Sequence, residues 1–147
     1  MAISKLVAVT WLTLLAIFSL APAADADSHS YVRTQSGKTR CLVMTNDVGH
    51  GGGPAVACEY TPGFPQAPVS SGGFHFDIAS VDAAGNLKWD IGNIGGAGTP
   101  QNDIVLNYGR TYHLQGWTIQ PSFEGTRFTN DATGHGMFVS IDNVRAF

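Results

Sequence analysis

The chain has 147 residues, of which 44% are hydrophobic and 13% are charged, and its formal net charge is -3 at pH 7. This composition excludes a disordered chain, because disordered segments combine few hydrophobic residues with a high net charge. No cluster of Lys and Arg stands out, which argues against nucleic acid as a partner, since phosphate binding needs concentrated positive charge. The 18 glycines and 7 prolines favour short strands and many turns over long helices.

The N-terminus has the pattern of a secretory signal peptide. Lys5 precedes an uncharged apolar run over residues 6–20, and Ala21-Pro22-Ala23 offers small residues at the positions that signal peptidase requires. We therefore expect a signal peptide over residues 1–23, with Ala26 as an alternative site for the cut. The apolar run is short for a membrane span, which needs about 20 residues, and acidic and polar residues follow it.

Residues 24–147 have the usual size of one domain. We expect a single β domain over this range, with no transmembrane span in the mature chain. The signal sequence predicts that this domain is secreted or associated with the cell envelope.

Cys41 and Cys58 are the only cysteines, and an even pair in an exported chain predicts one disulfide bond. If the two residues lie opposite each other on adjacent antiparallel strands, the turn between the strands is centred on Gly49 and His50. A turn is expected there in any case, because residues 46–54 are rich in Gly, Asn and Asp. The same register would pair the residues that follow: Leu42 with Ala57, and Val43 with Val56.

Short runs with a two-residue hydrophobic period, separated by Gly, Pro, Asn and Asp, predict strands along the rest of the chain. Two long connections interrupt them, at residues 61–73 and 92–101. We expect an all-β fold: a single-domain antiparallel β-sandwich or flattened barrel of about seven to nine short strands with one disulfide. The expected strands cover residues 31–34, 39–45, 54–60, 74–79, 87–91, 104–106, 111–119, 126–129 and 137–144.

One constellation occurs twice: TND, one or two residues, then GHG, in residues 45–51 and again in residues 129–136. One interpretation is a metal site formed where the two loops meet, with carboxylate and imidazole ligands. The other is that both segments are hairpin turns, because Asn and Asp bond to their own backbone and Gly supplies positive φ. The spacing matches no established metal signature, so we favour turns and expect no metal and no cofactor. The candidate ligands, should a metal bind, are Asp47, His50, Asp131 and His135.

The sequence predicts no catalytic residue. No GxSxG pattern occurs, and the two cysteines are expected to be bonded to each other. His75, beside Asp77 on an expected strand, could act as a base, but a lone strand histidine usually faces solvent. Trp89 and Trp117 could stack on a sugar, although large aromatic residues in so small a domain usually belong to the core.

The chain resembles a group of small exported proteins of mycobacteria and related actinobacteria. The segments that carry the resemblance are SGKTRCLV, VACEY, GWTI and TNDATGHGMFVSIDNV, and its paired cysteines match Cys41 and Cys58. The resemblance implies a secreted or envelope-associated location and a disulfide-bonded β domain. The group brings no assigned activity and no catalytic residue.

Three functions remain open at this point. We favour a non-enzymatic exported domain that binds an unidentified protein or envelope component through loops on a rigid scaffold. The alternative is a metal- or small-ligand-binding module that uses the two TND–GHG loops. An envelope hydrolase ranks third.

The signal pattern predicts that the exported protein begins at Ala24 or Asp27, because Ala23 and Ala26 are the residues that suit the cleavage site. Intact-mass spectrometry of secreted material measures the start directly. A membrane-bound species that retains residues 1–20 would contradict the prediction.

Overall fold

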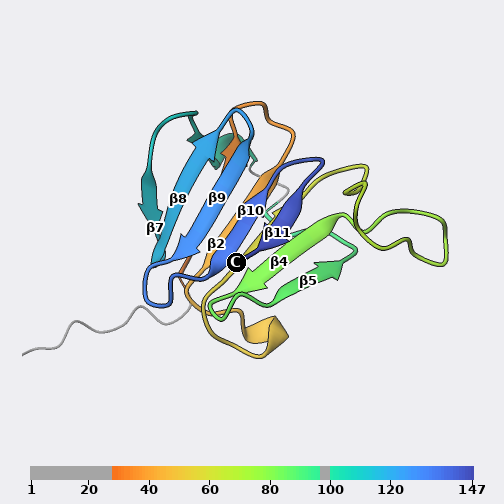
Figure 1. Ribbon diagram of the computed structural model, residues 1–147, viewed down its shortest axis with the longest axis horizontal. Coiled ribbons are helices and arrows are strands. Elements are labelled where there is room, and N and C mark those ends of the chain that lie inside the picture. Colours follow the sequence, from red (N-terminus) through yellow and green to blue (C-terminus); the bar gives the residue numbers. More distant parts are fainter. Residues whose placement is uncertain (1–27, 97–99) are drawn as a thin grey trace, which may run out of the picture.

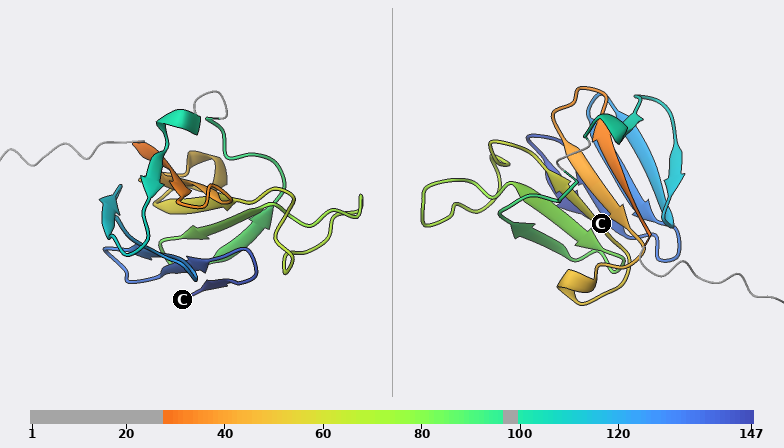
Figure 2. Two further views of the ribbon diagram at one scale, coloured as in Figure 1. Left: turned by 90° about the horizontal axis from the view of Figure 1, so that it is seen from above. Right: turned by 180° about the vertical axis from the view of Figure 1, so that it is seen from behind.

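The computed structural model describes residues 28–96 and 100–147, and in them two β-sheets pack face to face (Figures 1 and 2). This confirms the predicted all-β sandwich. The predicted signal peptide and both of its cleavage positions lie outside the described residues.

The first sheet has six strands in the order β5-β4-β3-β2-β1-β6. Neighbouring strands are antiparallel except for β1 and β6, which pair in parallel, with Val32 opposite Ile104. Two short 3-10 helices, η1 (Val48–His50) and η2 (Pro100–Asn102), lie in the connections. The strands are β1 (His29–Thr34), β2 (Arg40–Met44), β3 (Ala55–Glu59), β4 (Ile78–Asp82), β5 (Leu87–Asp90) and β6 (Ile104–Leu106).

The second sheet has five strands in the order β11-β10-β9-β8-β7, each antiparallel to its neighbours. Figure 2 shows it in blue, as a layer of its own against the first sheet. Its strands are β7 (Tyr112–Leu114), β8 (Trp117–Ser122), β9 (Gly125–Asn130), β10 (Gly136–Val139) and β11 (Val144–Ala146).

The disulfide between Cys41 and Cys58 is present, and it joins β2 and β3 in the predicted register. Leu42 lies opposite Ala57, and Val43 lies opposite Val56. The predicted turn centre falls in η1. Both sulfur-bearing side chains are buried between the sheets, so the bond fixes which side chains of β2 and β3 face the core.

The described residues form eleven strands, where the sequence predicted about seven to nine. The range 111–119, expected as one strand, is instead the hairpin of β7 and β8. Gln115 (φ 53°) and Gly116 (φ 78°) form its two-residue turn, and positive φ at both positions is the mark of a type I′ turn. The chain therefore reverses at Gly116, and Trp117 and Ile119 are both fully buried in the core.

The segment 137–144 likewise contains the end of one strand, a turn and the start of the next. The strand expected over residues 74–79 also differs, because β4 begins only at Ile78. Phe74 is 72% exposed, and the buried residues are Ala79 and Val81, on the face opposite to the one expected from Phe74, Phe76 and Ile78. The phenylalanines belong to the end of the long connection, so their alternation was not a strand period.

That connection, residues 61–77, closes one end of the core. Phe64 is fully buried and its ring lies 5.6 Å from that of Trp89, while Ala67 is buried beside it. The remaining core comes from the inner faces of both sheets, with Trp117, Phe128, Ile119, Leu106 and Met137 as the largest members.

Replacing both Cys41 and Cys58 by Ser should lower the free energy of unfolding by about 2–4 kcal/mol, because the bond restricts the unfolded chain and both side chains are buried. Denaturant unfolding with and without reductant measures the loss. Wild-type protein in reductant should resemble the double variant. Free thiols in alkylated native protein would contradict the bond itself.

Candidate functional site

The outer face of the six-stranded sheet carries a groove of about 300 Å³. Its floor lies in three rows of the strand register: Leu42–Ala57–Ser80, the row that contains Ile78 and the row that contains Met44. Because β side chains alternate between faces, these residues point away from the core that their neighbours Val43, Val56 and Val81 fill. The half-buried residues of the floor are Leu42, Met44, Ala57, Ile78 and Ser80.

Two connections wall the groove. On one side, the loop that contains η1 contributes Asp47 and His50, whose Nδ1 lies 2.9 Å from an Asp47 carboxylate oxygen. The His50 Nε2 lies 3.9 Å from the carboxylate of Asp90 at the end of β5. On the other side, residues 91–94 complete the wall. Apolar floor and acidic wall therefore meet at Asp90.

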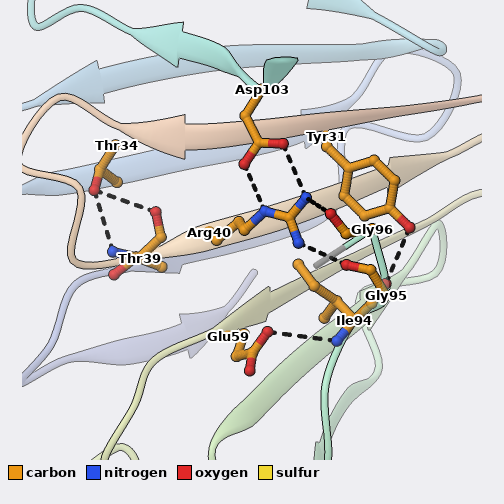
Figure 3. A network of polar contacts seen from close by, with 9 residues as sticks. All are labelled: Tyr31, Thr34, Thr39, Arg40, Glu59, Ile94, Gly95, Gly96 and Asp103. Atoms are coloured by element: carbon orange, nitrogen blue, oxygen red, sulfur yellow. Dashed lines mark hydrogen bonds and ion pairs between the residues drawn. The ribbon is translucent and has the colours of Figure 1, made fainter. Parts of the chain in front are cut away.

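Arg40, on the outer face of β2, forms hydrogen bonds with the segment that follows the groove wall of residues 91–94 (Figure 3). Its guanidinium donates to both carboxylate oxygens of Asp103, at 2.5 and 2.9 Å, and to the carbonyl oxygens of Gly95 (2.6 Å) and Gly96 (3.1 Å). Its Cζ lies 4.5 Å from the centre of the Tyr31 ring. Arg40 thus satisfies acceptors at Gly95, Gly96 and Asp103, tying these residues to the sheet.

The Arg40–Asp103 pair is largely removed from water, with side-chain exposures of 17% and 2%. The hydrogen bond with Asp103 raises the pKa of Arg40, so the guanidinium stays charged at every physiological pH. Two further hydrogen bonds hold the nearby wall of the groove. The Tyr31 hydroxyl donates to the Ile94 carbonyl at 3.2 Å, and the Ile94 amide donates to Glu59 at 3.4 Å.

The two TND–GHG loops both contact the β4–β5 turn, but their side chains have different hydrogen-bond partners. The β4–β5 turn is between them: the Ala83 amide donates to the Pro54 carbonyl of the first loop, and the Thr133 hydroxyl of the second donates to the Ala83 carbonyl. His135 packs against Gly85 of the same turn, and its Nδ1 lies 3.2 Å from the Phe147 carbonyl.

Asp82 shapes this turn by accepting hydrogen bonds from the amides of Ala84 (2.9 Å) and Asn86 (3.0 Å). Partial burial alone would raise the pKa of Asp82. The hydrogen bonds from Asn86 and Ala84 outweigh that effect, so the pKa of Asp82 is lowered and the carboxylate is held ionised.

The four candidate metal ligands therefore do not converge on one site. Asp47 and His50 contact each other at the groove, His135 contacts Phe147, and Asp131 accepts a 2.6 Å hydrogen bond from the Thr118 hydroxyl. Within residues 28–96 and 100–147, no three His, Cys, Asp or Glu side chains come together as a metal site would require. In the same ranges, no helix is long and apolar enough to span a membrane.

The Asn residues of the repeat have the turn role that the sequence suggested. The Asn46 side chain accepts from the Gly53 amide at 2.7 Å, and the Asn130 side chain accepts from the amides of Ala132 and Thr133. In each loop, Asn therefore bonds to its own backbone, whereas the Asp that follows it bonds to a side chain.

The other residues weighed in the sequence are also placed. His75 lies 2.9 Å from the Ala67 carbonyl through Nδ1, and Asp77 accepts from the Gly92 amide. Trp117 is fully buried, and Trp89 is half-buried against Phe64. The groove and the Arg40–Asp103 pair were missed. The one available signal was the two-residue period of 40–44, which puts Arg40, Leu42 and Met44 on one face.

The comparisons with known proteins add no relative: no family model, no curated protein and no solved structure matches this chain. The resemblance to exported actinobacterial proteins stays a prediction.

Replacing Arg40 by Ala should lower the free energy of unfolding by about 3 kcal/mol, because the Asp103 carboxylate would stay buried without its partner. Denaturant unfolding measures the change. Arg33→Ala is the matched control, since Arg33 lies directly opposite Arg40 on β1 but forms no ion pair with a described residue. Equal losses in the two variants would show that the ion pair adds nothing.

We expect His50 and His135 to be turn residues and the protein to carry no stoichiometric structural metal. A His50→Ala, His135→Ala double variant should then melt within a few degrees of wild type, with or without chelator. A marked rise in melting temperature with Zn²⁺ or Ca²⁺ that the double variant loses would contradict this.

Glycine variants test the same loops. The sequence suggested that valine at Gly49 or at Gly134 would be more harmful than either histidine change. Gly134 has the positive φ (75°) on which this expectation depends, but Gly49 lies in η1 without a positive φ. The residues of that loop with positive φ are Gly51 (102°), Gly52 (82°) and Gly53 (89°). The harmful variants should therefore be Gly51→Val and Gly134→Val.

Proposed function

We propose that this protein is an exported, non-enzymatic binding domain that acts at the cell surface or outside the cell and holds a small amphipathic ligand in the groove. The observation that supports this most directly is the groove itself: an apolar floor on a rigid sheet, walled by two connections. Its volume is at the lower end of the range for small-molecule sites, about 300–1,000 Å³.

The chemistry of the groove favours a ligand with an apolar body and a cationic or hydrogen-bond-donating group. Leu42, Ala57 and Ile78 offer apolar surface, while Asp90 and the Asp47–His50 pair offer acceptors at one end. Lys88 is the only lysine or arginine that lines the groove. A ligand cation would thus meet two carboxylates, and its apolar body would displace water from the floor.

Export is supported by the signal pattern in the sequence and by the disulfide, because such bonds persist in oxidising compartments. The anchored walls fit a binding role as well. Arg40 holds the connection beyond residue 94, so the groove requires little ordering when a ligand arrives.

Binding fits the groove better than hydrolysis. The Asp47–His50 pair has the form of an oriented base, but a nucleophilic mechanism needs a hydroxyl or thiol within hydrogen-bond reach of the imidazole. In the described part of the chain, His50 has only carboxylate partners, Asp47 and Asp90. The alternative function, a metal- or small-ligand-binding module, fits this geometry only in part, because the first TND–GHG loop lines the groove and the second does not.

The test uses a pair of fluorescent probes with the same naphthalene body and opposite charge: cationic dansylcadaverine and anionic 1-anilinonaphthalene-8-sulfonate. Dansylcadaverine should bind saturably at one site, and the anionic probe should bind much more weakly. Asp90→Asn should weaken the cation several-fold, because it removes the exposed carboxylate at the groove end. Fluorescence titration measures both affinities.

A second variant tests the floor. Ala57→Trp places an indole in the middle of the groove and should abolish probe binding, whereas Ala132→Trp, in an exposed turn of the other sheet, should leave it unchanged. Thermal melting of each variant shows whether the fold is kept. The proposal fails if no saturable binding occurs, or if folded Ala57→Trp binds the probe as wild type does.

A further inference from the structure

The opposite side of the molecule, the outer face of the five-stranded sheet, has a different chemistry from the groove. In Figure 2 no further layer of the described chain lies outside this sheet. One register row across it runs Arg145–Phe138–Arg127–Gln120, on β11, β10, β9 and β8. Two guanidinium groups therefore flank an aromatic ring on this outer face.

Each guanidinium lies over a ring. The Arg127 Cζ is 3.6 Å from the centre of the Phe147 ring, and the Arg145 Cζ is 4.9 Å from that of Phe138. Phe147 pairs with Gly136 through two backbone hydrogen bonds of 3.0 Å. This pairing places Phe147 beside β10, and its ring lies against Arg127 of β9.

Stacking on a ring leaves the edge of a guanidinium, with its N–H donors, available to another molecule. In the part of the chain that the structure describes, neither Arg127 nor Arg145 has a carboxylate within 4.0 Å. The rings also hold the side chains in place, which lowers the entropy lost when a ligand is bound. These are two positioned cations without a counter-ion.

The next row adds neutral polar groups: Thr129 lies opposite Thr118, which lies opposite His113. Asp131 lies at one end of this sheet, where the Thr118 hydroxyl donates to it at 2.6 Å, and the exposed Glu124 and Asp142 lie in the turns at the opposite end. The face thus combines two guanidinium groups and aromatic surface with hydroxyl and amide groups that can bond to sugar hydroxyls.

We propose that this face binds an anionic polysaccharide, with Arg127 and Arg145 on successive carboxylate groups of the polymer. Arg127 is on β9 and Arg145 is on β11, with β10 between them. The two positions are therefore about 9.5 Å apart in the direction perpendicular to the strands. A polymer with regularly repeated carboxylates can reach both at once, which multiplies two weak contacts, whereas one small anion can occupy only one.

A polysaccharide fits better than nucleic acid. Nucleic acid carries phosphates at high density and its binding sites contain many Lys and Arg residues, but this chain has a net charge of -3 and only two arginines in the row. Guanidinium groups match the planar carboxylate with paired hydrogen bonds, and the row across four strands offers an extended chain several contacts.

The experiment measures retention of the protein on immobilised polygalacturonate at low salt, with neutral dextran as the uncharged matrix and single-stranded DNA as the phosphate polymer. Wild type should be retained on polygalacturonate, not on dextran, and more strongly than on DNA. An Arg127→Gln, Arg145→Gln double variant should bind about tenfold more weakly or worse. The matched control is Lys38→Gln, Arg110→Gln, which removes the same charge from exposed sites outside the row, one of them also a guanidinium over a ring, and should bind as wild type does.

An Arg127→Lys, Arg145→Lys variant keeps the charge but loses the planar fork, and it should lie between wild type and the Gln variant. Thermal melting confirms that each variant is folded. The proposal is overturned if the Gln variant is folded and retained like wild type, if the Lys38→Gln, Arg110→Gln control loses retention equally, or if DNA is bound more tightly than polygalacturonate. Free galacturonic acid should compete far less well than the polymer at equal carboxylate concentration; equal competition would overturn the two-site argument.

Discussion

The register of β2 against β3 is the constraint on which the other features depend. Side chains alternate along a strand, so a slip of one residue would move Cys41 and Val43 out of the core and turn Leu42 inward. The disulfide bond to Cys58 prevents that slip with a covalent link. It thereby decides which side chains pack against the second sheet and which are left to form the floor of the groove.

The two outer faces of the sandwich differ because their sequences fill the outward positions differently. On the six-stranded sheet these positions hold Leu42, Ala57 and Ile78, and the connection held by Arg40 runs along the edge of this apolar area. On the five-stranded sheet they hold Arg127 and Arg145, stacked on rings. A small domain can present two chemically distinct surfaces in this way, since its core uses only the inward half of each strand.

Sequence reasoning worked where a local pattern coincided with a covalent constraint. The register of β2 and β3 followed from two cysteines and the glycine-rich turn between them. It failed at Gln115–Gly116, because a non-glycine residue with positive φ carries no strong signal, and the hairpin was taken for one strand. It also failed at Phe74, where alternating aromatic residues belong to a loop.

The candidate site was less accessible from sequence than the fold. The sequence singled out Asp47 and His50, but as ligands of a metal shared with the second TND–GHG loop. In the structure, the side chains of that loop have other partners. The Arg40–Asp103 pair joins residues distant in sequence, and nothing local in either segment indicates its partner. The groove likewise depends on four strands and two connections meeting in space, which only the assembled sheet determines.

The parallel pairing of β1 with β6 has a consequence for the order of folding. β1 is an interior strand, yet the partner on one of its sides is the last strand of that sheet to be synthesised. Until residues 104–106 arrive, β1 exposes a row of unpaired backbone groups, which is the kind of edge at which chains associate wrongly. The first sheet can therefore be completed only late, and its assembly should be slower than that of the second sheet, whose strands all pair with sequence neighbours.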